Sequence, residues 1–273
     1  MCIFRYLAVA LLLASTPVAA QGPKSTAQPL PQVLIIGDST YSQHTRELTK
    51  LLKGQVDITY ARWQPHEIAD TATTLQTLDR HLGRIGKNGE PVEPAKWPQW
   101  DLIHVNCGLG DLIHRAPGMK SFRVMPIHVG GIRNTPVDRY TKNLETLIKT
   151  LKAKAAGARI VWASTTPIRA SASGVFAMGS EIQYNQAAAQ VMQQHDVPIN
   201  DMHTFTKHLI NMDKPAGFGA DPFHFDKKPL HMPIVRVIER AFQLPPMAVT
   251  EEETISQQNA AQAANLGKAD ASQ

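Results

Sequence analysis

Residues 32–39 read Q-V-L-I-I-G-D-S, and this stretch decides the fold class. An uninterrupted run of Val, Leu and Ile is typical of a strand that is buried on both faces of a parallel sheet, and Gly37 ends the run. A serine at the tight turn after such a strand presents its hydroxyl at the edge of the sheet, beside the first free N–H groups of the next helix. Ser39 is therefore a candidate nucleophile. The alternative is that Asp38 and Ser39 only cap the helix.

Working outward, four more apolar runs predict four further strands, and apolar residues spaced by three and four predict helices between them. The strands are expected at 56–61, 101–106, 158–164 and 197–200, and the helices at 42–52, 71–82, 137–155, 180–195 and 232–242. Strands that alternate with helices indicate an α/β fold, a doubly wound parallel sheet with helices on both faces. Ligands in such folds bind at the carboxyl ends of the strands.

The two ends of the chain differ in composition from this domain. Residues 1–20 combine Arg5, a short apolar run and small residues at 18–20, which predicts a signal peptide that is cleaved before Gln21. We therefore expect an exported protein, periplasmic or secreted, without a stable membrane anchor. Residues 21–31 form a flexible lead-in, residues 32–244 the folded domain, and the Ala/Gln/Glu-rich residues 245–273 a predicted disordered tail.

Charge and cysteine content narrow the class of protein. The formal net charge of +5 is scattered, with no dense Lys/Arg block, so nucleic acid is not an expected partner. Cys107 has no partner for an internal disulfide after removal of Cys2 with the signal peptide, so the fold must depend on its core. Residues 87–99 and 116–136 are long loops of the kind that form lids or the rim of a site.

A second candidate segment is D-P-F-H, from Asp221 to His224, just before the last predicted helix. An acid three residues before a histidine can hold the ring Nδ1–H, which leaves Nε2 to take a proton from a serine hydroxyl. Taken alone, the segment is equally compatible with a surface loop. Together with Ser39 it places Ser, Asp and His at one edge of the sheet, in a chain order that convergent triads use.

With these blocks in view, the chain resembles the SGNH/GDSL hydrolases from about Val33 to Phe242. The resemblance is carried by I-I-G-D-S at 35–39, D-P-F-H-F at 221–225, and V-N-C-G-L-G-D at 105–111, the last similar to a subgroup pattern N-x-G-L-H-D. It implies a three-layer α/β/α sandwich, flavodoxin-like, around a five-stranded parallel sheet. It also implies a serine hydrolase acting on esters (esterase, lipase or carbohydrate deacetylase), with Ser39 as nucleophile, His224 as base and Asp221 as its orienter, without a cofactor or a metal.

The resemblance departs from the family pattern at the oxyanion hole. The family supplies a side-chain donor where this chain has Gly110, and a glycine N–H where this chain has Ala69. Backbone N–H groups at these positions, or the side chain of Asn106, are the candidate replacements. The expected substrate is an ester of a small acyl group, on a small molecule, a lipid or an O-acylated glycan. The alternative is a degenerate, non-catalytic member that binds a glycan or a partner protein.

Overall fold

The computed structural model describes residues 29–61, 63–65, 67–119, 122–170, 174–214 and 230–270. Within them lies one five-stranded parallel sheet in the order β2-β1-β3-β6-β7, which confirms the predicted α/β class. Its strands are β1 (Gln32–Ile36), β2 (Asp57–Tyr60), β3 (Leu102–Val105), β6 (Arg159–Ala163) and β7 (Ile199–Asn200). The expected signal peptide, residues 1–20, lies outside the described residues. None of the described helices is long and apolar enough to cross a membrane.

The order of the strands determines where a site can form. The chain runs from β1 to β2 on one side and then returns to β3 on the other side of β1. In the register, Ile35 lies between Tyr60 of β2 and His104 of β3. The carboxyl ends of β1 and β3 therefore mark the point where the winding of the sheet reverses, and α/β folds bind ligands in the crevice at such a point.

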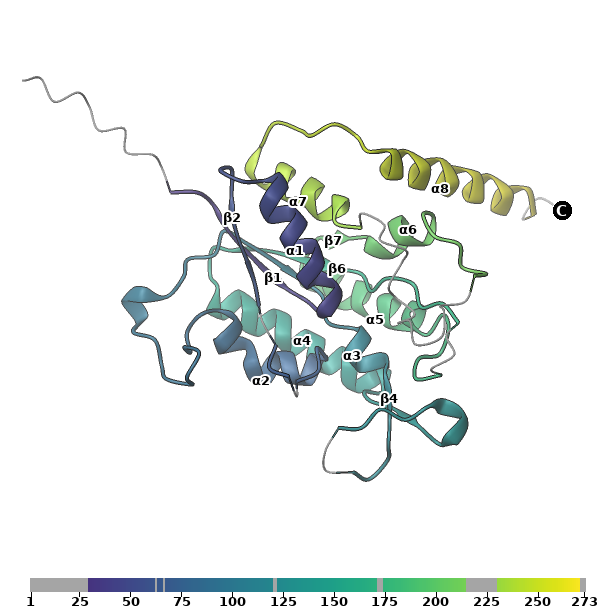
Figure 1. The fold of residues 1–273 in the computed structure, drawn as a ribbon, viewed down its shortest axis with the longest axis horizontal. Coiled ribbons are helices and arrows are strands. Elements are labelled where there is room, and N and C mark those ends of the chain that lie inside the picture. Colours follow the sequence, from purple (N-terminus) through teal and green to yellow (C-terminus); the bar gives the residue numbers. More distant parts are fainter. Residues whose placement is uncertain are drawn as a thin grey trace, which may run out of the picture.

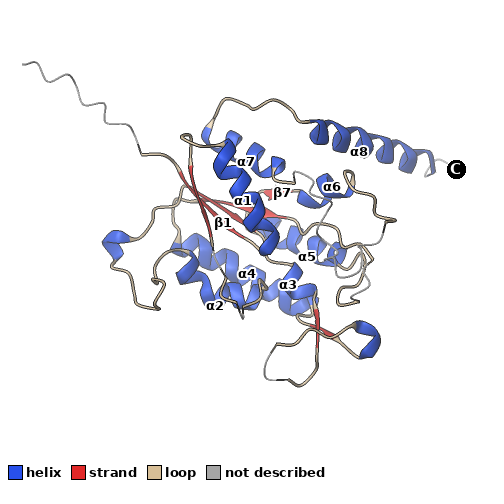
Figure 2. Cartoon of the chain, in the orientation of Figure 1, coloured by secondary structure: helices blue, strands red, loops and turns tan. Residues whose placement is uncertain are grey.

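Helices cover both faces of the sheet (Figure 1). Leu34 and Ile36 of β1 pack with α2 (Thr71–His81), α4 (Val137–Lys154) and α5 (Glu181–Gln194). Val33 and Ile35 point to the opposite face and pack with α1 (Ser39–Leu51) and α7 (Met232–Phe242). This alternation explains why β1 reads as a continuous apolar run, since both of its faces are buried. The result is the expected three-layer α/β/α sandwich (Figure 2).

Several short elements lie in segments for which the sequence predicts only loops. Two 3₁₀ helices, η1 (Pro94–Lys96) and η2 (Ile127–Val129), lie in the two long loops. The second of these loops also contains the strand β5 (Ile132–Arg133), which pairs in antiparallel fashion with β4 (His114–Arg115). The remaining short elements are the helices α3 (Leu109–Leu112) and α6 (Met202–Lys207). They are too short to show a helical period in the sequence.

The prediction of a disordered tail at 245–273 is corrected by a helix, α8 (Glu251–Asp270). Thr250 and Glu253 cap its start reciprocally, with Thr250 N–H donating to Glu253 (2.9 Å) and Glu253 N–H to the Thr250 hydroxyl (3.3 Å). Arg236 of α7 then makes two hydrogen bonds to the Glu253 carboxylate, at 2.7 and 2.8 Å. The low content of bulky apolar residues does not prevent ordering here, because polar contacts hold α8 and its Ile255 packs on a small apolar cluster with Leu209 and Leu230.

Candidate active site

The turn after β1 leaves Ser39 exposed to solvent. Gly37 and Asp38 are buried, whereas Ser39, the first residue of α1, is exposed. The Asp38 carboxylate caps the helix by accepting from the Thr40 N–H (2.8 Å) and the Thr40 hydroxyl (2.6 Å). Asp38 therefore fulfils the capping role, which leaves the Ser39 hydroxyl available for chemistry.

Two aromatic side chains fix the main chain of this turn. Trp63 Nε1 donates to the Gly37 carbonyl at 2.6 Å, and the Tyr60 hydroxyl donates to the Asp38 carbonyl at 2.8 Å. Position 37 must be glycine, because a Cβ there would lie 2.4 Å from the Tyr41 ring. Side chains from the end of β2 and from the segment after it therefore hold the turn that presents Ser39.

The opposite wall of the site is main chain from two segments in close contact. A Cβ on Gly110 would lie 2.6 Å from both the carbonyl carbon and the oxygen of Ala69, and 2.7 Å from the Asp70 nitrogen. This contact is the physical reason for glycine where the family pattern has a side chain. Gly110 is the second residue of α3, so its N–H has no acceptor within the helix. Among the described residues, none accepts a hydrogen bond from the Ala69 N–H.

A buried polar network holds the two segments together. Asn134 Nδ2 bridges them by donating to the Asp70 carboxylate (2.7 Å) and to the Gly110 carbonyl (3.0 Å). Asp111 accepts from the N–H (2.9 Å) and the hydroxyl (2.7 Å) of Thr71, at the start of α2. Burial raises the pKa of Asp111 to about 7. Asp70 and Asn134 were not predicted as site residues, although a D-T before a periodic helix is a recognisable cap.

Ser39, Ala69 and Gly110 line one cavity of about 410 Å³. Its apolar walls include Trp63, Ile113 and Phe176. The structure therefore brings together the predicted nucleophile and two of the three predicted oxyanion positions. Ser39 and Gly110 each stand in the first turn of a helix, where backbone N–H groups have no acceptor within the helix, so the residues that line this cavity include main-chain groups that are able to donate.

Asn106 requires a correction. It is buried, and its Nδ2 donates to the Ala163 carbonyl (2.8 Å) and to the Thr165 hydroxyl (3.4 Å). It does not line the cavity with Ser39. Its side chain joins the ends of β3 and β6, so the expectation that it replaces the missing oxyanion donor is not supported.

Asp221 and His224, predicted to complete the triad, lie outside the described residues, and their roles stay predictions. The chain re-enters the described part at Leu230 and His231. Burial, and to a smaller extent the neighbouring His231, lowers the pKa of His44 to about 4. His44 is on α1, five residues after Ser39, which is about 7.5 Å along a helix. His231 therefore lies near α1, and the next residue, Met232, packs in the same core cluster as Leu48 of α1.

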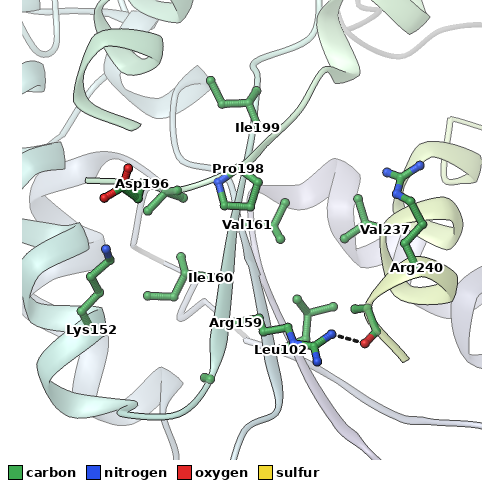
Figure 3. Close-up of a pocket in the computed structure, with 13 residues that line it drawn as sticks. Leu102, Lys152, Arg159, Ile160, Val161, Asp196, Pro198, Ile199, Val237 and Arg240 are labelled. Atoms are coloured by element: carbon green, nitrogen blue, oxygen red, sulfur yellow. Dashed lines mark hydrogen bonds between the residues drawn. The ribbon is translucent and has the colours of Figure 1, made fainter. Parts of the chain in front are cut away.

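A second cavity, of about 520 Å³, lies at the opposite edge of the sheet, at the amino ends of β3, β6 and β7. Figure 3 shows Lys152, Arg159 and Arg240 around its apolar floor. The described residues that line it include no Ser, Thr, Cys or His, so they offer no hydroxyl or thiol nucleophile and no imidazole base. Among the described residues no group of three or more His, Cys, Asp and Glu side chains is placed to hold a metal ion.

Comparison with known proteins agrees with this geometry. The model of the GDSL-like lipase/acylhydrolase family matches residues 35–228. Similar solved structures include an acetyl xylan esterase, AlAXEase (TM-score 0.54, 13% identity, covering 77% of this chain and 98% of that chain). Another is a variant of an acetyl xylan esterase from Geobacillus stearothermophilus (0.52, 14%, 81% and 98%). A third is a putative platelet activating factor from Streptococcus pneumonia (0.51, 17%, 80% and 86%). No curated protein matches the chain.

Proposed function

The chain belongs to the GDSL-like lipase/acylhydrolase family of ester-hydrolysing enzymes, and from this premise we propose that Ser39 is the nucleophile of an exported serine esterase that forms an acyl-enzyme. The observation that carries the proposal is the exposed Ser39 at the start of α1, in one cavity with Ala69 and Gly110. A nucleophile and preorganised N–H donors in one water-accessible cavity are what acyl transfer requires.

In the proposed reaction, Ser39 Oγ attacks the ester carbonyl carbon while His224 takes the hydroxyl proton and Asp221 holds the imidazolium. The carbonyl oxygen becomes an oxyanion that accepts from the N–H groups of Ser39, Ala69 and Gly110. The tetrahedral intermediate collapses, the C–O bond to the alcohol breaks, and His224 gives its proton to the leaving oxygen. Water, deprotonated by His224, then attacks the acyl-enzyme and releases the acid and free Ser39.

The main-chain donors explain how the site can work without the family's side-chain donor. One oxyanion donor is worth about 2.7–4 kcal/mol, or roughly 10²–10³ in rate. The close approach of Gly110 to Ala69 places the main chain of both segments on the same wall of the cavity. The contact leaves no room for a side chain at position 110. We infer that the hole is built from backbone and that the departures from the family pattern leave the enzyme active.

The acyl group is proposed to be small. The cavity of about 410 Å³ must hold the acyl group and part of the alcohol, and Trp63, Ile113 and Phe176 give it apolar walls. Two of the structural neighbours are acetyl xylan esterases, which makes an O-acetylated glycan one substrate to test beside a lipid ester.

The test is hydrolysis of p-nitrophenyl acetate, with labelling by a fluorophosphonate probe, for the native protein, Ser39→Ala and Ser42→Ala. Ser42 is a matched control because it lines the same cavity one helical turn after Ser39. We expect Ser39→Ala to abolish labelling and to lower kcat by at least about 10⁴-fold, whereas Ser42→Ala keeps both within a few-fold. A folded native protein that neither turns over nor is labelled would instead support the non-catalytic binding protein.

A further inference from the structure

Residues 113–119 and 122–136 form an arm between α3 and α4 that projects from the body of the molecule (Figure 1). The arm is a small antiparallel ladder with β4 in its centre. Arg115 of β4 is paired with Ile132 of β5 on one side and bridged to Val124 on the other. Residues directly opposite one another in an antiparallel ladder project to the same face, so Val124, Arg115 and Ile132 form one row.

The two faces of the arm have different environments. His114, next to Arg115 in β4, is buried, and the Nδ1 atom of its ring lies 3.1 Å from the Val175 carbonyl oxygen. Because successive residues in a strand alternate between faces, the row with Arg115 faces away from this contact. Val124 is 53% exposed and Ile132 is 46% exposed. The arm is therefore anchored by one face and presents the other to the surroundings.

The turn η2, between Val124 and Ile132 in the chain, adds two more exposed aliphatic side chains to the arm. Ile127 is 42% exposed and Val129 is 57% exposed. We call the surface formed by Arg115, Val124, Ile127, Val129 and Ile132 the outer face of the arm. Of the nine exposed large hydrophobic side chains in the described part of the chain, five belong to the arm, so this exposure is concentrated rather than scattered. Concentrated apolar exposure marks an interaction surface.

The charge of the arm identifies the kind of partner. Residues 112–137 contain no Asp and no Glu. Arg123, the neighbour of Val124 in the chain, is exposed, and Arg115 lies in the row of the outer face, half-buried and with its Nε atom covered. Arg133 stacks over the Tyr184 ring, 5.5 Å from its centre, and so contributes to the anchored side. The arm thus combines exposed aliphatic side chains with arginines and has no acidic residue. This combination suits an anionic lipid bilayer, in which anionic headgroups cover an apolar interior.

We propose that the outer face of the arm docks reversibly on an anionic phospholipid bilayer. The arm starts at Ile113, which lines the cavity of Ser39 together with Gly110. Docking would therefore bring the lipid surface next to this cavity and favour ester substrates that are held at the membrane. The choice of substrate rests on the proposed function of Ser39, whereas the docking itself does not.

The experiment is co-sedimentation with vesicles of phosphatidylglycerol and phosphatidylcholine (1:1), compared with vesicles of phosphatidylcholine alone. Ile127→Asp combined with Val129→Asp tests the aliphatic contribution, and Arg123→Glu tests the charge. Val249→Asp is the matched control, because Val249 is 64% exposed but lies between α7 and α8. Thermal unfolding of every variant verifies that the fold is kept.

We expect at least tenfold tighter binding to the anionic vesicles than to the neutral ones. The aspartate pair should weaken binding at least tenfold and Val249→Asp should not change it. Each unit of charge near an anionic surface is worth about fivefold, so Arg123→Glu, a change of two units, should cost about 25-fold. Ser39→Ala should bind like the native protein, and the arm variants should hydrolyse p-nitrophenyl acetate normally, which separates docking from catalysis.

Two results would overturn the proposal. One is that the native protein does not bind the anionic vesicles, or that the aspartate pair binds them as well as the native protein does. The other is binding to soluble dextran sulfate that is as tight as binding to vesicles and is lost in Arg123→Glu but kept in the aspartate pair. That pattern would assign the arm to a polyanionic glycan instead of a bilayer.

Discussion

Replacement of Gly110 by Ala tests whether the oxyanion wall depends on close contact between two segments of main chain. Gly110 lies within α3, where helix propensity alone predicts that Ala stabilises the protein by about 1 kcal/mol. The contact predicts the opposite sign. The new Cβ would lie 2.6 Å from the Ala69 carbonyl, whereas ordinary contact begins near 3.4 Å, so the main chain must separate by 0.8 Å (3.4 minus 2.6).

Such overpacking costs about 1–3 kcal/mol of unfolding free energy. The same shift would move the N–H groups of Ala69 and Gly110 away from the oxyanion, and a displacement of about 1 Å in an active site can cost roughly 10²-fold in rate. We therefore expect Gly110→Ala to be less stable in urea denaturation and to have about 10²-fold lower kcat on p-nitrophenyl acetate. Gly110→Asn, which resembles the family pattern more closely, should be worse rather than better.

Gly86→Ala is the control, since a Cβ at Gly86 would find its nearest atom at 3.6 Å. The reasoning is refuted if Gly110→Ala is as stable and as active as the native protein. If the variant lost stability but kept its kcat, the contact would be structural and the oxyanion donors would have to be sought elsewhere.

Three further predictions concern pH, the C-terminal helix and export. Burial lowers the pKa of His44 and His81 to about 4 and of His104 to about 3, so these residues are neutral in the folded protein but gain protons on unfolding below about pH 6.5, and stability is lost as the pH falls from there. Between pH 6.5 and 5.5 this loss should be smaller by about 1 kcal/mol in His104→Gln than in the native protein, as measured by urea denaturation; equal pH profiles of the two proteins would contradict the assignment. Arg236→Ala should release α8 and make residues 245–250 sensitive to proteinase K, whereas Lys50→Ala, which breaks the exposed ion pair with Glu47, should not. Expression of the full chain in a bacterial host should give an exported protein that begins at Gln21 in N-terminal sequencing; a protein that keeps Met1 would contradict the signal peptide.

The sheet and the five long helices could be predicted from the sequence because their signals are local. The run before Gly37 and the leucines of α2 and α4 show the periods of buried strands and of amphipathic helices. The position of Ser39 at the start of α1 likewise follows from a strand that turns directly into a helix. These features need only neighbouring residues, and the structure confirms them.

The oxyanion wall could not be predicted in the same way, because it depends on contacts between distant segments. Nothing near Gly110 in the sequence shows that Ala69 lies against it, and nothing near Asn106 shows that the Ala163 carbonyl takes its amide. The helix α8 is a different case. Its T-x-x-E capping signal at 250–253 is visible in the sequence, but the low apolar content of residues 245–273 favours disorder. Arg236, which binds Glu253 of α8, lies on another helix, so this contact cannot be read from the tail itself.

The brevity of β7 has a consequence for how copies of this protein meet. Its two residues pair only with Trp162 and Ala163 of β6, so the first half of β6 is paired with β3 on one side but has no strand on the other, where the cavity in Figure 3 lies. An unpaired strand edge invites a strand from another molecule and so promotes aggregation. Here Lys152, Arg159 and Arg240 frame the gap, and Pro198 at its border has no N–H to donate. Two copies that approach edge to edge would bring these cations together, and their repulsion opposes aggregation through the unpaired part of β6.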